Sequence, residues 1–180
     1  MKDETSYTQG AGSRVAIAGH PLHPMLVPLP VGALIGALCT DIAFAITGDV
    51  FWARGSVWLL GAGFVTGVLA ALGGLLEAAL ITRARKLKMT WAHAIGNMVA
   101  LGVAGANMIV RLDDPAEAIV VRGLVTSAIT VMILAFTAWL GGEMSFRHGI
   151  GVSKKLARKT GLPTRPDPAA GPTVPFVTIP

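Results

Sequence analysis

The chain has 180 residues, of which 53% are hydrophobic and 14% are charged, and its mean hydropathy is +0.64. This composition is typical of an integral membrane protein and leaves no room for a separate soluble domain. The net charge of +5 comes from basic residues beside apolar stretches, so nucleic-acid binding is not expected. With Cys39 as the single cysteine, a disulfide framework and a thiolate metal cage are excluded.

Four apolar stretches are each long enough to cross a bilayer, whose core of about 30 Å needs roughly 20 helical residues. They lie near residues 25–47, 56–82, 90–110 and 118–140. The sequence therefore predicts an all-α, polytopic membrane protein with a four-transmembrane-helix bundle. The expected parts are a polar cytoplasmic segment (1–19), the transmembrane domain (20–152) and a basic, then proline-rich, cytoplasmic tail (153–180).

The first stretch is preceded by GHPLHPMLVPLP, which contains Pro21, Pro24, Pro28 and Pro30. Proline lacks an N–H donor and is tolerated in the first turn of a helix or outside it. The chain is therefore predicted to be extended through His20 and His23, with the helix starting between Met25 and Val31.

The basic residues indicate the orientation of the bundle. The connection between the second and third stretches contains Arg83, Arg85, Lys86 and Lys88 without an acidic residue, whereas the next connection is acidic overall. Because basic loops stay in the cytoplasm, both termini are predicted to be cytoplasmic, in a bacterial inner membrane. Lipid is the expected surrounding, with an electron-transfer partner or a homo-oligomer as candidate protein partners.

Two charged residues are predicted to lie inside the membrane near its outer surface. Asp41 belongs to the first stretch and Arg122 to the fourth. A charge at membrane depth costs about 2.5–3.5 kcal/mol on insertion scales, so each needs a partner. We expect a structural ion pair between Asp41 and Arg122, and a proton-relay role for Asp41 is the alternative.

The third stretch contains a polar helix face. His93, Asn97 and Asn107 fall near one line along the helix together with Ala100 and Ala104, at 100° per residue. This narrow face of small and polar residues is predicted to point into the bundle. Glu77 on the second stretch is expected at a similar depth to His93, on a face rich in glycine and alanine.

All four histidines are predicted to gather at the cytoplasmic side of the bundle, because the four stretches alternate in direction. The set comprises His20, His23, His93 and His148, accompanied by Glu77 and Glu143. Gly141 and Gly142 are expected to loosen or end the fourth helix, so that the residues after them fold back over the cytoplasmic mouth.

Three interpretations of this cluster remain open. In the first, two histidines bind the iron of haem b, with His93 as one ligand and His20, His23 or His148 as the other. In the second, Glu77, His93, Glu143 and His148, with or without the other histidines, hold a non-haem ion such as iron, manganese or zinc. In the third, these side chains are bonded to each other and to backbone groups without a cofactor.

Three motifs support a resemblance to a known family: GHPLHPMLVPLP before the first helix, WAHAIGN at the start of the third, and GGEMSFRHGIGV after the fourth. Over roughly residues 18–153 the chain resembles a bacterial four-helix inner-membrane family catalogued as a domain of unknown function. The family pattern falls on His20, His23, His93, Asn97, Gly141, Gly142, His148 and Gly149. Glu77 stands where the resemblance leads us to expect aspartate more often.

Some members of that family are joined to Rieske-type iron–sulfur domains, so the resemblance implies redox chemistry. The functional hypothesis is a redox-related membrane subunit with a haem or metal ion in the cytoplasmic His/Glu cluster. The alternative is a non-catalytic structural or partner-docking protein in which this cluster is only hydrogen-bonded. Nothing in the sequence identifies a substrate, so no enzymatic activity is assigned.

Overall fold

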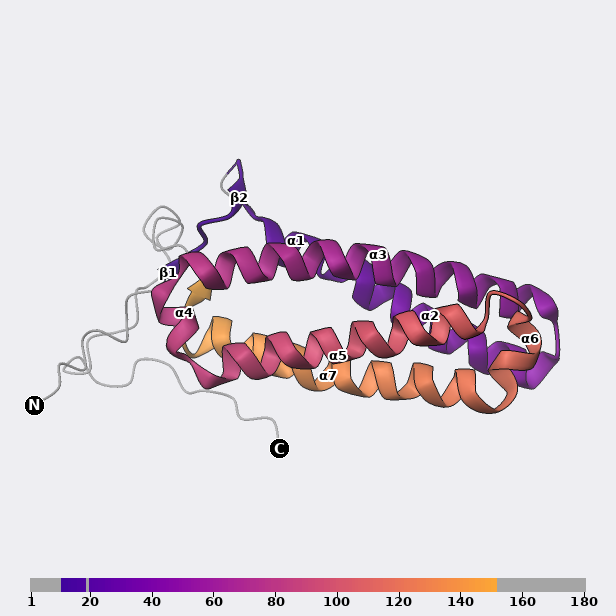
Figure 1. The fold of residues 1–180 in the computed structure, drawn as a ribbon. Coiled ribbons are helices and arrows are strands. Elements are labelled where there is room, and N and C mark those ends of the chain that lie inside the picture. The colour runs from indigo at the N-terminus through magenta and orange to yellow at the C-terminus, as the bar shows by residue number, and fades with distance from the viewer. Residues whose placement is uncertain (1–10, 19, 152–180) are drawn as a thin grey trace, which may run out of the picture.

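The computed structural model describes residues 11–18 and 20–151, and four long helices dominate it (Figure 1). The first is formed by α1 (Leu22–Leu26) and α2 (Pro28–Thr47), the second is α3 (Val50–Leu80), the third is α5 (Lys88–Val110) and the fourth is α7 (Leu124–Phe146). Each of these four is long and apolar enough to span a membrane. The predicted all-α, four-helix fold is therefore confirmed. The predicted tail (153–180) and the first ten residues lie outside the described residues.

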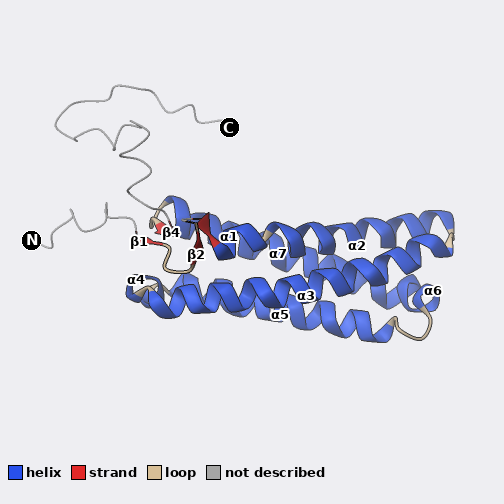
Figure 2. Ribbon diagram, turned by 90° about the horizontal axis from the view of Figure 1, so that it is seen from above, coloured by secondary structure: helices blue, strands red, loops and turns tan. Residues whose placement is uncertain are grey.

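Short elements connect the long helices at both ends of the bundle. The connectors are α4 (Thr82–Lys86), α6 (Pro115–Ala118) and the π-helix η2 (Ile119–Gly123). β1 (Ala11–Gly12) pairs in parallel with β4 (Ile150–Gly151), and β2 (Ala16–Ile17) pairs antiparallel with β3 (His20–Pro21). The strands lie at the same end of the bundle as α4, and α6 lies at the other (Figure 2). We call the first the histidine end, since all four histidines lie on elements that meet there, and the second the α6 end.

The helix starts differ from the prediction at two places. His23 is helical rather than extended, because α1 begins at Leu22 and places Pro24 in its first turn, where no N–H donor is required. The helix then continues almost without a break, since the Val27 N–H donates to the His23 carbonyl at 3.1 Å. The second long helix begins at Val50 rather than near residue 56, because the Asp49 carboxylate caps it by accepting from the Phe51 N–H.

The fourth helix also differs at both ends. Gly141 and Gly142 do not end α7, which continues to Phe146. Before α7, the chain forms the π-helix η2. The predicted helix near 118–140 is thus divided into a π-helical turn and a longer α-helix.

The helices pack closely because small residues lie between them. α2 packs mainly against α3, and α5 mainly against α7. The core between these pairs consists of Leu34, Ala37, Leu60, Ala100, Ala104 and Leu134. A Cβ atom added at Gly63 would lie 2.7 Å from the Leu34 Cγ, and one at Gly96 would lie 2.5 Å from the Thr137 Cγ2. These glycines allow the approach of backbones that stabilises helix pairs in lipid.

A buried polar network ties the four long helices together near the α6 end. Arg111 and Asp41 both have fully buried side chains, and two hydrogen bonds of 2.5 and 2.8 Å join the guanidinium to the carboxylate. Ser56 and Ser127 each donate to the carboxylate, at 2.5 and 2.6 Å. Asn107 accepts from the Arg111 Nε at 2.9 Å. The network therefore satisfies both charges with hydrogen bonds, which a buried ion pair requires.

The predicted pair between Asp41 and Arg122 is wrong, because Arg111 occupies the place assigned to Arg122. Arg111 follows the last residue of α5, and its side chain folds back into the bundle beside Asn107, one helical turn earlier. Arg122 belongs to η2 and is exposed. Gly123 leaves space for the buried guanidinium, since a Cβ atom there would lie 2.7 Å from the Arg111 Nη2.

Candidate cofactor site

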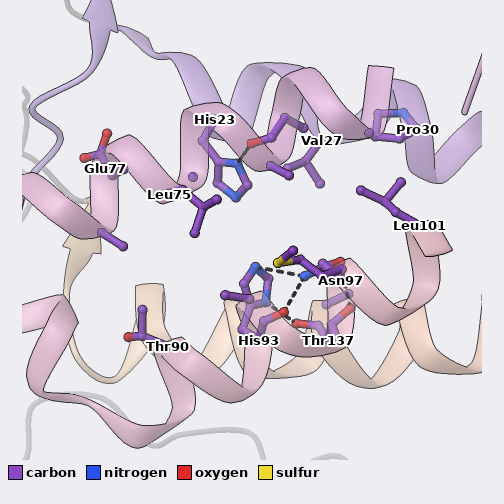
Figure 3. Close-up of a pocket in the computed structure, with 18 of the residues that line it drawn as sticks. His23, Val27, Pro30, Leu75, Glu77, Thr90, His93, Asn97, Leu101 and Thr137 are labelled. Carbon is purple, nitrogen blue, oxygen red and sulfur yellow. Dashed lines mark hydrogen bonds between the residues drawn. The ribbon is translucent and has the colours of Figure 1, made fainter. Parts of the chain in front are cut away.

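An apolar cavity lies inside the histidine end, between α1, α2 and α3 on one side and α5 and α7 on the other (Figure 3). Its volume is about 180 Å³. This is smaller than the about 300–1,000 Å³ that is usual for small-molecule and cofactor sites, so a group as large as haem requires the helices on the two sides to move apart. The cavity is partly open, so a ligand has a route of entry.

The walls of the cavity are formed by small and aliphatic side chains. Those of α3 and its neighbours include Gly67, Ala70, Ala71, Gly74, Ala78, Ala84, Ala94 and Ala138. Along α3 the lining runs from Gly67 to Ala78, which is about 16 Å at 1.5 Å per residue. We refer to this cavity as the slot.

His23 enters the slot from α1 and docks against α3. Its Nδ1 lies 2.8 Å from the carbonyl oxygen of Ala70. One helical turn further along α3, Gly74 provides the space for the ring, because a Cβ atom there would lie 2.9 Å from the His23 Cε1. A carbonyl oxygen can only accept, so the His23 Nδ1 carries the proton and its Nε2 is left as the unprotonated nitrogen in the neutral ring.

His93 enters the slot from α5 and docks against α7 in the same way. Its Nδ1 lies 2.8 Å from the carbonyl oxygen of Thr137. One turn further along α7, a Cβ atom at Gly141 would lie 3.2 Å from the His93 Cε1. The Asn97 amide nitrogen lies 3.2 Å from the His93 Nε2 and also donates to the His93 carbonyl at 2.8 Å. The same reasoning assigns the proton to Nδ1 and a lone pair to Nε2.

The two imidazoles point toward one another across the slot (Figure 3). Their ring centroids are 6.3 Å apart, and their planes are nearly perpendicular, at 87°. Backbone carbonyls that fix the Nδ1–H of a histidine are the usual partners by which proteins orient a histidine for metal binding through Nε2. The arrangement is thus suited to one group that accepts a nitrogen ligand on each of two opposite faces.

The other predicted site residues lie at the same end but not in this arrangement. His20 is exposed on β3, and His148 follows α7, half-buried. Glu143 forms an ion pair of 3.0 Å with Arg147. The predicted metal set of Glu77, His93, Glu143 and His148 is not brought together. Within residues 11–18 and 20–151, no group of three or more His, Cys, Asp or Glu side chains could hold a metal ion.

A family model described as predicted membrane protein (DUF2231) matches residues 19–154. The chain belongs to this family. No curated protein and no solved structure matches it. Like the family it belongs to, the chain is a predicted integral membrane protein, and the matched segment contains all four long helices and both cavity histidines.

The polar face predicted on the third helix lies inside this DUF2231 bundle. Asn97 lines the cavity beside His93, and Ala100 and Ala104 are buried in the core. Asn107 is buried too, but it belongs to the Arg111 network. It lies about 21 Å from His93 along α5, at 1.5 Å per residue. One helix face therefore serves two polar centres near opposite ends of the DUF2231 domain.

Sequence reasoning missed the backbone partners of the two histidines. The carbonyls of Ala70 and Thr137 carry no signature of their own, but each belongs to a residue four positions before a glycine, Gly74 or Gly141. Small residues at this spacing are more commonly sites of close helix packing in lipid. In this DUF2231 protein the same spacing accommodates an imidazole ring.

Proposed function

We propose that the protein is a membrane-embedded electron carrier that binds one b-type haem between His23 and His93. The observation that carries this proposal is the pair of imidazoles, 6.3 Å apart between centroids, that reach the slot from two helices. Each has its Nδ1 bonded to a carbonyl, which leaves Nε2 available as a ligand.

The number of ligands favours haem over a non-haem ion. Zinc and similar ions in proteins are held by three or four protein ligands. Haem iron already has four porphyrin nitrogens and takes one or two axial ligands, of which histidine is a common one. The cavity offers two histidines, and the neighbouring carboxylates of Glu77 and Glu143 have other partners. Two imidazoles on opposite walls are sufficient for haem and insufficient for a free ion.

The polarity of the slot supports the same choice. A porphyrin is a flat, largely apolar ring, and the slot is likewise lined mainly by apolar side chains. Glycine and alanine on α3 and α7 keep the walls thin on both sides of the histidines. Cofactor sites of helical bundles are built in this way, from side chains on facing helices.

The axial positions explain why electron transfer is the proposed role. With His23 and His93 on opposite faces, the iron would have no coordination position left for a substrate. Histidine ligation in an apolar surrounding is one of the ways in which a protein sets the potential of haem iron. His93 would exchange its contact with the Asn97 amide for the iron, while Asn97 keeps its hydrogen bond to the His93 carbonyl.

Charge supports a cytoplasmic location for the haem. The basic residues of α4 and its flanks lie at the histidine end, and Asp113, Asp114 and Glu117 lie at the α6 end. The positive-inside rule then directs the histidine end and both termini to the cytoplasm of a bacterium. An electron-transfer partner would therefore approach from the cytoplasmic side or within the inner membrane.

A non-catalytic structural or docking role is the second candidate. It is favoured by the hydrogen bonds that already hold His93, Asn97 and Thr137 together without any ligand. In that case the slot would be filled by lipid or by a partner, and purified protein would be colourless.

An absorption spectrum distinguishes the two candidates. The full chain is purified in detergent from cells supplied with a haem precursor and is measured before and after reduction by dithionite. A Soret band that shifts and sharpens on reduction supports haem. A colourless protein that also fails to take up added hemin would reject the haem proposal and favour the structural role.

A further inference from the structure

The amino-terminal part of the described chain forms a strap at the histidine end of the bundle. We use this name for residues 13–18 and 20–22, which lead from β1 to α1. β1 directly precedes the strap and pairs with β4, which follows α7. The β2–β3 pair lies within the strap. The last residue of the strap, Leu22, is also the first residue of α1. The strap thus connects the ends of the fourth and first long helices across the histidine end (Figure 2).

Glu77 fastens the strap to α3. Its carboxylate accepts three hydrogen bonds, from the Ser13 hydroxyl at 2.9 Å, the Arg14 N–H at 3.0 Å and the Val15 N–H at 3.2 Å. Hydrogen bonds to an ionised carboxylate are roughly twice as strong as those between neutral groups. Two of the three donors are backbone groups, so the contact depends on Glu77 rather than on the side chains of Arg14 and Val15.

A short chain of bonds leads from Glu77 to His23. The Val15 N–H donates to Glu77, and the Val15 carbonyl accepts from the Leu22 N–H at 2.9 Å. Leu22 is joined directly to His23. Glu77 and His23 also both line the cavity, on the wall formed by α1 and α3. The carboxylate therefore fixes the backbone that carries one of the two imidazoles.

We propose that Glu77 is a positioning residue for His23, which it holds in place for iron binding by fastening the strap. This inference rests on the proposed haem function. It also assigns Glu77 a role different from the metal ligand expected from the sequence. Release of the strap would free the entry to α1 and allow His23 to leave the iron.

The experiment compares the wild type with Glu77→Ala, and Arg14→Ala serves as the matched control. Two quantities are measured on the purified full chain: hydrogen exchange of the segment that contains Arg14 and Val15, and the haem spectrum. In Glu77→Ala the exchange of these two amides should become about tenfold faster or more, because each loses a hydrogen bond to a charged group. The haem spectrum should change from six-coordinate low-spin toward five-coordinate high-spin. Arg14→Ala should change neither, since Arg14 contributes its backbone N–H.

The outcomes separate this inference from the proposed function. Unchanged exchange in Glu77→Ala would overturn the contact itself. Faster exchange with an unchanged haem spectrum would overturn the positioning role. If the wild type takes up no haem, the proposed function and the role of Glu77 in iron binding both fail, and exchange still tests the strap.

A second variant avoids any loss of folding caused by a change within α3. Ser13→Ala removes one of the three donors and lies outside the long helices. It should accelerate the same amides less than Glu77→Ala does. If Ser13→Ala leaves their exchange unchanged while Glu77→Ala cannot be produced, the inference is rejected.

Discussion

His23 and His93 dock against different helices in the same manner. Each donates its Nδ1–H to a carbonyl, that of Ala70 or Thr137, at 2.8 Å. In each case the residue four positions after that carbonyl is a glycine, whose missing Cβ leaves space for the ring. Two separate stretches of the chain thus provide the same docking site for an imidazole, which consists of a carbonyl acceptor and a glycine four residues later. The two docking sites face each other across the slot.

Gly74→Ala tests whether the docking site of His23 on α3 is needed for haem binding. The new methyl group would lie 2.9 Å from the His23 Cε1, so the ring must move away from the Ala70 carbonyl. Loss of the hydrogen bond that orients a metal-binding histidine typically costs 10–100-fold in affinity. We expect haem affinity, measured by titration of haem-free protein with hemin, to fall by about tenfold or more.

Gly102→Ala is the matched control for this change. Nothing lies within 4 Å of a Cβ atom at Gly102, which is also in a long helix. Alanine is a better helix former than glycine, so this variant should keep haem affinity and at least wild-type thermal stability. Equal haem affinity in the two variants would mean that haem binding does not depend on the docking of His23 against Ala70 and Gly74.

The Asp41–Arg111 pair is predicted to dominate the stability of the α6 end. Removal of either partner leaves a buried charge unpaired, which typically costs about 3–5 kcal/mol. Asp41→Ala and Arg111→Ala should each lower the thermal unfolding temperature in detergent. The double variant should lose much less than the sum of the two, because residues of one hydrogen-bonded network are coupled.

Arg122→Ala provides the control for this cycle. Arg122 is exposed on η2, and surface substitutions of this kind usually change stability by less than about 0.5 kcal/mol. A loss as large as that of Arg111→Ala would restore the pair between Asp41 and Arg122. Additive losses for Asp41→Ala and Arg111→Ala would show that these two side chains do not meet.

The fold could be predicted from the sequence because it depends on the length and polarity of whole segments. Four apolar stretches of about 20 residues or more leave few alternatives to a helical bundle in lipid. The inward face of the third helix was also predictable, since His93, Asn97 and Asn107 share one side at 100° per residue. These inferences need no knowledge of which helices become neighbours.

The details of the polar centres could not be predicted, since they depend on helix ends and backbone groups. Arg111 follows the last residue of α5, outside the helix itself, yet its long side chain reaches back to Asp41. His23 was expected in an extended segment because of the prolines around it. Glu77 contacts mainly backbone N–H groups of the strap, which carry no sequence signal.

Cysteine labelling tests the proposed orientation. In a Cys39→Ser background, Lys86→Cys places a thiol on α4, and Asp113→Cys places one in the connection at the α6 end. Both positions are exposed. With intact inner membranes, a reagent that cannot cross lipid should label position 113 from the periplasmic side, and position 86 after the membrane is opened. The reverse pattern would place the histidine end outside the cytoplasm.

The most direct test of the central claim is the haem spectrum of four histidine variants, each measured on purified full-length protein. His23→Ala and His93→Ala each remove one proposed axial ligand, whereas His20→Ala and His148→Ala alter histidines of the same end that do not line the cavity. We predict a six-coordinate low-spin haem in the wild type and in the two control variants, and its loss or conversion to high-spin in the other two. Wild-type spectra in His23→Ala and His93→Ala, or a wild type that takes up no haem, would contradict the account.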